Sequence, residues 1–491
     1  MRDLFLSIDV GTGSIRAALV DAAGRILAIA AREHEQIVPR HGWSEQRPAE
    51  WWAGTAAAIR DVLGRVEGAP ARVGAVCTCG QMHGTVLIDG DGHLTREAVP
   101  LWNDKRSQPQ SDALAARLGD DALALAANLP APAWPATKLM WLMENDPEAV
   151  AHASAVLMPK DWINYRLTGR AAQDRTEASL SFLMDPETGD WSPALIEAAG
   201  LPARLLRPIL SPADILGPVT AKAAAETDLP AGLPVLAGAG DYPAALIGSG
   251  VAAPGLASDV TGTSTIMTIL HAAPVRNPAV SNVCTVEGNW GAMTLLDAGG
   301  DAVRWARRAF HENRRSFEDL EQAAAHARPG AEGLFFLPYL SGERFHPASR
   351  AQFFGLTAAH GLAELHRAVL EGVAFSVRHK LDALGAARPE WVVAAGGGAR
   401  SPLWLRIKAS LYGAPFVVPE EPECGLVGNA AMAAAATGAA PSLADAVARM
   451  VHHGAEIAPD PDWAKQYDRM MPLYADLYEM ARGVCHRLEG L

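Results

Sequence analysis

The chain has 491 residues, 49% of them apolar and 20% charged, and a formal net charge of −13. This length exceeds what one hydrophobic core normally serves, so we expect a globular protein of two or three domains. The negative charge argues against a nucleic-acid-binding surface. It does not exclude nucleotides, because helix N-termini and backbone amides bind phosphate without basic side chains.

The cysteines and the N-terminus point to the cytoplasm. Five scattered cysteines, an odd number, fit reduced thiols better than a disulfide framework. Only Met1 and Arg2 precede the charged Asp3, so no signal peptide is apparent. No uninterrupted apolar run reaches the roughly 18 residues of a membrane span. We therefore expect a cytoplasmic protein with neither membrane nor nucleic-acid partners.

The first candidate site is a turn between two predicted strands, Leu4–Val10 and Ile15–Val20. Its small residues expose backbone N–H groups and hydroxyls to a phosphate, and Asp9 at its base could hold Mg²⁺ through water. A plain glycine hairpin explains the same residues equally well. A Walker loop needs Gly-Lys-Ser/Thr and a dinucleotide fingerprint opens a helix, so neither fits. The candidate phosphate ligands are Gly11, Thr12, Gly13 and Ser14.

Two polar clusters follow in the first half of the chain. The predicted strand Val73–Cys79 ends in a loop that carries a histidine between two glycines. A histidine at a strand end can contact a polar ligand, but a solvated or structurally bonded histidine is the ordinary and slightly favoured alternative. A second polar cluster follows Leu101 and Trp102. The candidate residues of both clusters are Gln81, Met82, His83, Asn103 and Asp104.

A carboxylate near the middle of the chain is the centre of the prediction. The helical segments that precede it are Ala49–Leu63, Ser111–Leu129, Lys138–Asn145, Pro147–Ala155 and Asp161–Leu167. The apolar run Leu233–Ala237 then leads through Gly238 and Gly240 to Asp241. Because glycines let a ligand approach the backbone closely, Asp241 is the candidate catalytic base.

The second half repeats the plan of the first. Predicted strands at Leu256–Val260 and Ile266–Leu270 enclose another turn of glycine and hydroxyl residues, which is what two related domains facing one nucleotide would show. The stretch Gly248–Gly255 is the predicted hinge. The candidate phosphate ligands of this turn are Thr261, Gly262, Thr263 and Ser264.

A glycine triplet marks a third candidate site. The predicted strand Trp391–Ala395 runs into Gly396, Gly397 and Gly398, and a helix follows at Pro402–Leu411. This arrangement leaves room for a flat ring or a phosphate at the helix N-terminus, although a tight structural turn is about as good an explanation. The remaining predicted helices are Leu362–Leu384, Gly428–Thr437 and Trp463–Leu488.

Together these motifs resemble the FGGY carbohydrate kinases, most closely the xylulokinase group, over nearly the whole chain. Each motif alone is common, but their set and order are specific. The matching segments are Asp9–Ser14, Trp43–Gln46, Gln81–Gly84, Leu101–Asp104, Pro135–Asn145, Gly240–Asp241, Thr261–Ser264, Leu337–Arg344, Phe353–Glu371 and Gly396–Ser401.

The resemblance implies an α/β fold of two actin-like, ribonuclease H-like domains, as in sugar kinases and hexokinase, with a catalytic cleft between them. Residues 1–247 would bind sugar and phosphate, and residues 248–491 would bind the nucleotide, with the last helix packing back on the N-terminal domain. ATP and Mg²⁺ are the implied cofactors, a sugar or polyol is the implied partner, and a homodimer is the family-like expectation.

The resemblance also implies residue roles. Asp241 would remove the proton of the substrate hydroxyl, and Asp9 would organise Mg²⁺. The two turns would hold the phosphates from opposite sides, and the glycine triplet would line the adenosine site. The residues expected at the sugar are Gln81, Met82, His83, Asn103, Asp104 and Tyr242.

Two positions depart from the family pattern. Xylulokinase-like members usually have Asn after the catalytic Asp, where this chain has Tyr242, and the family has another residue at Ala133. A phenol in place of an amide changes the volume and hydrogen bonding of a sugar pocket, which puts the identity of the sugar in question. The stretch Glu287–Gly291 belongs either to the same pocket or to a buried turn.

The sequence thus predicts ATP-dependent phosphorylation of a ketose or related polyol, with D-xylulose to D-xylulose 5-phosphate as the first candidate. Ribulose, erythrulose and other pentuloses or polyols are alternative substrates. A non-catalytic ATP-binding switch protein of actin-like fold is the alternative from another class, and the carboxylate of Asp241 argues against it. A dehydrogenase is weaker still, because no glycine fingerprint precedes a helix and a ribose-binding acid.

Overall fold

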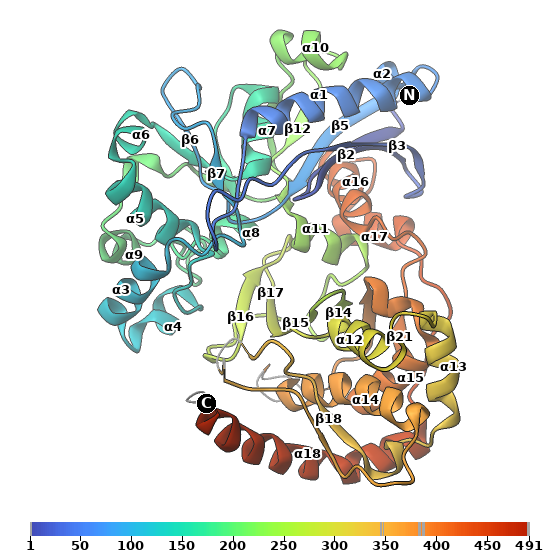
Figure 1. Cartoon of the computed structure of the whole chain (residues 1–491). Coiled ribbons are helices and arrows are strands. Elements are labelled where there is room, and N and C mark those ends of the chain that lie inside the picture. Colours follow the sequence, from blue (N-terminus) through green and yellow to red (C-terminus); the bar gives the residue numbers. More distant parts are fainter. Residues whose placement is uncertain (1, 344–345, 347, 382–383, 385–387, 489–491) are drawn as a thin grey trace. The chain divides into compact units, whose positions relative to one another are not determined.

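The computed structural model describes residues 2–343, 346, 348–381, 384 and 388–488, and the chain forms two compact units (Figure 1). The first unit comprises Met1–Ala252, Ala272–Gly291 and Glu423–His452, and the second comprises Ala253–His271, Ala292–Pro422 and His453–Leu491. The sequence-based division had one boundary, after residue 247. In the structure, two later segments belong to the first unit.

The first unit is built on one mixed sheet. Its strands, in sheet order, are β11 (Ile215–Pro218), β12 (Pro234–Leu236), β5 (Val73–Gly80), β1 (Leu4–Val10), β2 (Ser14–Asp21) and β3 (Ile26–Glu33). Strands β1, β2 and β3 form an antiparallel meander, whereas β5 is parallel to β1 and β12 is parallel to β5. Every residue of β1 and β5 is buried, which explains why both strands are mostly apolar on both faces, with Ser7, Asp9 and Thr78 as their buried polar residues.

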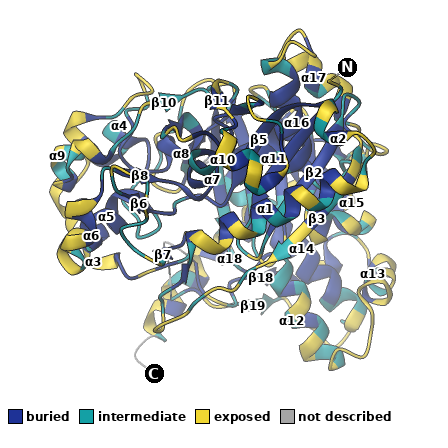
Figure 2. Ribbon diagram, turned by 90° about the horizontal axis from the view of Figure 1, so that it is seen from above, coloured by how far each residue is buried: buried dark blue, intermediate teal, exposed yellow. Residues whose placement is uncertain are grey.

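Helices cover both faces of this sheet. They are α1 (Pro48–Arg65), α7 (Pro159–Thr168) and α10 (Ala221–Thr227) on one face, and α11 (Asp241–Gly248), α16 (Cys424–Ala436) and α17 (Leu443–Met450) on the other. Leu6 lies in one core with Trp51 and Trp162. Its neighbour Phe5 points to the opposite face and lies in the other core with Leu426. Figure 2 shows β5, α11 and α16 largely in dark blue, the colour of buried residues.

The second unit has a sheet of the same plan. Its strands, in sheet order, are β17 (Trp290–Leu296), β15 (Thr265–His271), β14 (Ala257–Thr261), β20 (Val392–Ala395) and β21 (Phe416–Val417). Strand β14 is antiparallel to β15 and parallel to β20, as β1 is to β2 and β5. The order therefore matches β3, β2, β1, β5 and β12, and the predicted internal repeat is confirmed.

The helices of the second unit are α12 (Gly300–His311), α13 (Phe317–His326), α14 (Leu362–Leu381), α15 (Pro402–Tyr412) and α18 (Pro461–Arg487). Helix α18 packs on α14 and α15 of its own unit. The expected packing of this last helix on the N-terminal domain stays a prediction. Tyr474 of α18 stacks on Phe375 of α14 with ring centroids 5.4 Å apart.

Short elements complete both units. The remaining strands are β4 (Glu45–Gln46), β6 (Val86–Ile88), β7 (Val99–Pro100), β8 (Ala155–Leu157), β9 (Gln173–Asp174), β10 (Ile209–Leu210), β13 (Ala239–Gly240), β16 (Ser281–Cys284), β18 (Phe335–Leu337) and β19 (Gln352–Phe354). The remaining helices are α2 (Ala69–Arg72), α3 (Gln108–Leu118), α4 (Asp121–Ala126), α5 (Pro135–Asn145), α6 (Pro147–His152), α8 (Arg175–Ser179) and α9 (Pro193–Ala199). Within the described ranges, no helix combines the length and apolar character that crossing a membrane requires.

Two helix predictions were wrong in extent. The expected helix Ser111–Leu129 is two helices, because Gly119, with a φ of 52°, ends α3. The expected helix Pro147–Ala155 ends at His152, and Ala155 begins strand β8. Residues 382–383 of the predicted long helix and Arg344 of the family motif lie outside the described residues.

Candidate active site

Two carboxylates meet at the carboxyl ends of neighbouring strands in the first unit. Strands β1 and β13 both run parallel to β5, and Asp9 and Ala239 both lie opposite Cys79. Asp241 follows two residues after Ala239 and is the first residue of α11. The parallel register therefore brings Asp9 and Asp241 to the same edge of the sheet, on either side of β5.

Two glycines fix the approach to Asp241. Gly238 has a φ of 71°, and a Cβ on it would lie 1.9 Å from the carbonyl oxygen of Thr78. A Cβ on Gly240 would lie 2.7 Å from the sulfur of Met82. The amide of Gly240 also donates a hydrogen bond of 2.9 Å to Oγ1 of Thr176 on α8. The backbone before the candidate base is thus held by contacts that leave no room for a side chain.

The carboxyl group of Asp241 binds its proton more tightly than an ordinary aspartate. Burial, and next the negative charge of Asp9, raise its pKa to about 7, and the amide of Tyr242 at 2.7 Å from Oδ1 opposes this shift. Burial also raises the pKa of Asp9, while the guanidinium of Arg16 lowers it. Near neutral pH, Asp241 therefore exchanges readily between its acid and its carboxylate form.

Asp9 has one oxygen available for a ligand. Its Oδ2 pairs with Arg16, which also pairs with Glu423. Its Oδ1 is buried and has no hydrogen-bond partner among the described residues. A buried oxygen of this kind fits a cation or a water bound to one, and Mg²⁺ at Asp9 stays a prediction.

The turn between β1 and β2 is braced from one side and open on the other. The amide of Gly11 donates to the carbonyl of Ser14 over 3.1 Å. Thr12 accepts hydrogen bonds at its carbonyl from Gln46 and at its hydroxyl from Trp102. Gln81 bonds both Gln46 and Thr12 and is almost fully buried, so it supports the turn. A Cβ on Gly13 would meet nothing within 4 Å, so that side of the turn is open.

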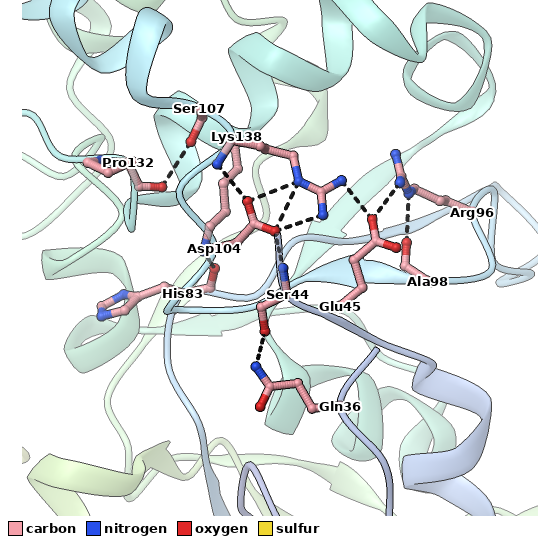
Figure 3. Close-up of polar contacts among 11 residues, drawn as sticks. Gln36, Ser44, Glu45, His83, Arg96, Ala98, Asp104, Ser107, Pro132 and Lys138 are labelled. Carbon is pink, nitrogen blue, oxygen red and sulfur yellow. Dashed lines mark hydrogen bonds and ion pairs between the residues drawn. The ribbon is translucent and has the colours of Figure 1, made fainter. Parts of the chain in front are cut away.

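His83 carries an unusual backbone and a neutral imidazole. Its φ of 69° is rare for a residue with a Cβ, and its Nδ1 is buried without a hydrogen-bond partner in the described part of the chain. Burial lowers the pKa of His83 well below its usual value, and the nearby Lys138 adds to the effect. Lys138 donates to the carbonyl of His83 over 2.7 Å (Figure 3), and the rings of His83 and Trp134 pack edge to face with their centroids 5.0 Å apart.

Asn103 and Asp104, neighbours in sequence, differ in what they can offer a ligand. Asp104 accepts hydrogen bonds from the amide of Ser44 at 2.6 Å and from Nη2 of Arg106 at 2.7 Å (Figure 3). The guanidinium of Arg106 in turn lies over Trp43, 3.7 Å from the ring centre. Both oxygens of Asp104 thus accept hydrogen bonds from the protein, and its expected place at the sugar stays a prediction. Oδ1 of Asn103 is buried and has no partner among the described residues.

The turn between β14 and β15 presents its backbone to solvent. The amide of Gly262 donates to the carbonyl of Ser264 over 2.9 Å, and Gly262 and Thr263 are exposed. The hydroxyl of Thr261 points the other way and donates to Oδ1 of Asp259 at 2.6 Å. Thr261 therefore supports the turn from below, and its expected contact with phosphate stays a prediction.

The glycine triplet lies beside this turn. Val260 and Ala395 are opposite each other in the parallel strands β14 and β20, so the turn and the triplet leave the sheet together. A Cβ on Gly396 would lie 2.6 Å from the carbonyl oxygen of Thr261, and one on Gly398 would lie 2.7 Å from its Cβ. A Cβ on Gly397 would meet nothing within 4 Å. Two of the glycines thus make the close packing possible, and the third leaves the surface open.

These glycines give a matched pair of variants. We expect Gly398→Ala to destabilise the second unit by about 1 to 3 kcal/mol, because the added methyl overlaps Thr261. Gly397→Ala, on the same short turn, should change the stability by less than about 0.5 kcal/mol. Thermal denaturation of both variants measures the difference, and equal melting temperatures would show that Gly398 has room for a methyl group.

Sequence reasoning missed two features next to the candidate site. Gly299 and Gly300 begin α12, and a Cβ on Gly300 would lie 2.0 Å from the carbonyl oxygen of Gly262. The Gly-Gly pair before an amphipathic helix was the available signal. In the first unit, Lys160 is fully buried and pairs with Asp174 at 2.7 Å. Glu177 lies nearby with neither carboxyl oxygen hydrogen-bonded within the described ranges, and no sequence pattern marks this group.

Both halves of the chain match models of one protein family. The models describe the N-terminal and C-terminal domains of the FGGY family of carbohydrate kinases and match residues 4–248 and 257–437. The xylulose kinase of Escherichia coli (strain K12) is 32% identical over 418 residues, which are 84% of this chain and 85% of that protein. The autoinducer-2 kinase of Salmonella paratyphi A is 28% identical over 516 residues, covering 98% and 94%.

Solved structures agree with these sequence matches. The crystal structure of xylulose kinase from Rhodospirillum rubrum has a TM-score of 0.92 and 30% identity to this chain, covering 98% of this chain and 99% of that one. Two α/β units with one strand order, each with a glycine and hydroxyl turn after its first strand, define the actin-like fold of sugar kinases and hexokinase. The chain belongs to the FGGY family of carbohydrate kinases and is a phosphotransferase.

Proposed function

We propose that the protein transfers a phosphoryl group from ATP to a hydroxyl of a ketose or related polyol, with D-xylulose to D-xylulose 5-phosphate as the first candidate. The observation that carries the proposal is the placement of Asp241 beside Asp9 at neighbouring strand ends, with the pKa of Asp241 raised to about 7. The similarity to xylulose kinases over most of the chain supports this sugar. The chain is also 28% identical to an autoinducer-2 kinase over 516 residues, so other substrates are included in the test below.

Asp241 is the general base in this proposal. Its carboxylate accepts the proton of the acceptor hydroxyl and keeps that oxygen in line with the phosphorus atom it attacks. A base with a pKa near the working pH combines a useful fraction of carboxylate with a good proton affinity. The glycines before Asp241 support this role, because they let the substrate approach the backbone closely.

Two further groups of the first unit are available to orient the sugar. The imidazole of His83 is neutral, so its unpartnered Nδ1 can form a hydrogen bond with a hydroxyl. Oδ1 of Asn103 can accept another. Tyr242 follows the base directly and, in this proposal, lies at the sugar, where a phenol in place of an amide changes the volume and hydrogen bonding of the pocket.

The candidate nucleotide groups fit ATP and Mg²⁺ by their chemistry. The backbone around Gly13, Gly262 and Gly397 is open, because a Cβ on each would meet nothing within 4 Å, and such backbone can approach phosphate or a base. Oδ1 of Asp9 would hold Mg²⁺ directly or through water. Bound there, the ion would neutralise charge on the phosphates.

A substrate panel tests the proposal. ADP release would be coupled to NADH oxidation with D-xylulose, D- and L-ribulose, L-xylulose, erythrulose, glycerol and common pentitols. Turnover on D-xylulose alone is the expected result. Turnover on another compound would replace the sugar and make Tyr242→Asn the first variant to measure. ATP binding without turnover on any compound would favour a non-catalytic switch protein.

The pH dependence of catalysis tests the role of Asp241. Because only the carboxylate accepts a proton, kcat/KM for the sugar should rise about tenfold per pH unit below pH 7 and level off above it. The measurement is a series of initial rates from pH 5 to 9 with the coupling enzymes in excess. A flat profile between pH 5 and 7 would contradict a base with a raised pKa.

Two expectations from the sequence stay part of this proposal. One is a cytoplasmic location and the other is a homodimer. Size-exclusion chromatography with light scattering measures the mass in solution, and twice the chain mass of 51.8 kDa is the expected value. A mass of one chain would contradict the dimer and leave the proposed reaction unaffected.

A further inference from the structure

The two turns of the internal repeat start from equivalent aspartates. The first turn reads Asp-Val-Gly-Thr-Gly-Ser from Asp9, and the second reads Asp-Val-Thr-Gly-Thr-Ser from Asp259. Asp9 lies opposite Cys79 of the parallel neighbour β5, and Asp259 lies opposite Ala394 of the parallel neighbour β20. In both units the aspartate therefore lies near the end of the strand, just before the turn.

The surroundings of the two aspartates differ. Asp9 pairs with Arg16, whose side chain is 34% exposed, and keeps one oxygen without a partner. Asp259 is 1% exposed, and both of its oxygens are bonded. Oδ1 accepts from Nζ of Lys408 at 2.7 Å and from the hydroxyl of Thr261 at 2.6 Å, and Oδ2 accepts from Tyr412 at 3.4 Å. Unlike Asp9, Asp259 thus has a partner within the described residues for each of its oxygens.

Lys408 is buried as deeply as its partner. It lies on α15, is 1% exposed, and donates over 2.7 Å both to Asp259 and to the hydroxyl of Thr261. Burial lowers the pKa of Lys408, and the charge of Asp259 opposes that shift. A buried ion pair gives little net stability compared with apolar side chains of similar volume, so the contribution we consider for this pair is the geometry that it fixes.

Thr261 connects this buried ion pair to the glycine triplet. Its hydroxyl is bonded from below by Asp259 and Lys408. Its carbonyl oxygen and Cβ are in close contact with the glycine triplet, where a Cβ on Gly396 or Gly398 would overlap them. Because both candidate nucleotide-binding segments rest on Thr261, a shift of this residue moves both of them.

We propose that Lys408 is a positioning residue for the nucleotide. It neutralises Asp259 and fixes Thr261, and through Thr261 it holds the turn Thr261–Ser264 and the glycine triplet in the arrangement that binds phosphate and adenosine. This proposal rests on the proposed function of these two segments. In the first unit the equivalent aspartate stays open to a ligand, whereas in the second it is closed by a lysine and used as a support.

The first test is nucleotide affinity in the full chain. Lys408→Met leaves the carboxylate of Asp259 uncompensated below the turn and takes a donor from Thr261. We expect its dissociation constant for ADP, measured by calorimetry, to rise by about tenfold or more. In steady-state kinetics the KM for ATP should rise while the KM for the sugar changes less than about twofold. Lys408→Arg, which keeps the charge, should recover part of the affinity.

A second variant covers the case in which Lys408→Met does not fold. Asp259→Leu combined with Lys408→Met removes both charges, so the core keeps no unpaired ion and the melting temperature should stay near that of the parent. Its ADP affinity should still fall, because the hydroxyl of Thr261 has lost Asp259 and Lys408 and, of its partners in the described part of the chain, keeps the hydroxyl of Thr265 at 3.1 Å. Lys465→Met, an exposed lysine of the same unit with a side chain 73% exposed, is the control.

The outcomes separate the two proposals. A double variant that folds and binds ADP with the parental affinity overturns the role of Lys408. A rise in the KM for the sugar equal to that for ATP also overturns it, because a general structural loss would do the same. A parent protein that binds no ADP overturns the proposed function itself, whatever the variants do.

Discussion

Replacing Asp241 by Asn is expected to lower kcat by a factor of roughly 10² to 10⁴, the usual contribution of a general base, and to leave the affinity for ADP within about twofold of the parent. The amide keeps the size of the side chain but does not accept the hydroxyl proton. Steady-state rates with the best sugar of the panel and calorimetry with ADP measure the two effects. Asp120→Asn, on an exposed aspartate of the same unit, is the control.

The stability of the Asp241→Asn variant separates lost chemistry from lost folding. The folded pKa of Asp241, about 7, lies above its ordinary value of 3.8, so the folded protein holds a proton that the unfolded chain releases. The contribution of this group to stability is therefore present at low pH and is lost as pH rises through about 7. The variant should melt at or above the parental temperature at pH 8. Turnover near the parental rate would remove Asp241 from the role of base.

Replacing Lys160 by Met is expected to destabilise the first unit by about 3 to 5 kcal/mol, the range found when one partner of a buried ion pair is removed. Lys160 is fully buried and pairs with both Asp161 and Asp174. Without it, two buried carboxylates face each other. Burial and the charge of Asp174 already raise the pKa of Asp161 to about 6, although Lys160 opposes the shift.

Urea denaturation with matched variants measures this effect. Lys222→Met, on an exposed lysine of α10, should leave the unfolding midpoint unchanged. Lys160→Met combined with Asp174→Asn should recover part of the loss, because one of the two unpaired charges is gone. A single variant with a parental midpoint would mean that the carboxylates take up protons or water at little cost and that the ion pair is dispensable.

The two carboxylates at the strand ends, Asp9 and Asp241, were the part of the candidate site that the sequence predicted. Asp9 and Asp241 each follow an apolar run, and the glycines beside them indicate turns, so local sequence was enough to select both. Their closeness follows from the parallel register through Cys79, which the sequence does not state but which the fold class implies. The repeat of the turn at residue 261 was visible for the same reason, since both copies keep the pattern of glycines and hydroxyls.

Other features depend on partners that are distant in sequence. The hydroxyl of Thr261 looks like a phosphate ligand until Lys408, 147 residues away, is seen to hold it from below. From the sequence, Asp104 looks available for a sugar. In the structure, the guanidinium of Arg106 stacks on Trp43 and donates a hydrogen bond to Asp104. Hydrophobic patterns show that a residue is buried, but they do not show which polar partner meets it there.

The sequence also did not predict that the alanine-rich helix α16 belongs to the first unit. A helix with ten buried residues fits either core, and only its close packing assigns it. Gly248 of α11 is in such close contact that a Cβ on it would lie 1.8 Å from the carbonyl oxygen of Cys424. The sequence shows that two glycine-containing helices can pack tightly, but it does not pair them.

The split of the first unit into three segments determines when this protein can finish folding during synthesis. Helix α16 covers one face of the first sheet, and its unit is complete only when residues 423–452 have been made. The ribosome adds 452 − 252 = 200 residues after the first segment, which takes about 10 to 40 s at ordinary rates. During that interval the face with Phe5, Ala75 and Cys77 lacks α16 and α17, two of the three helices that cover it. The nascent chain therefore presents an apolar sheet to chaperones, and a fragment that stops at residue 252 should aggregate.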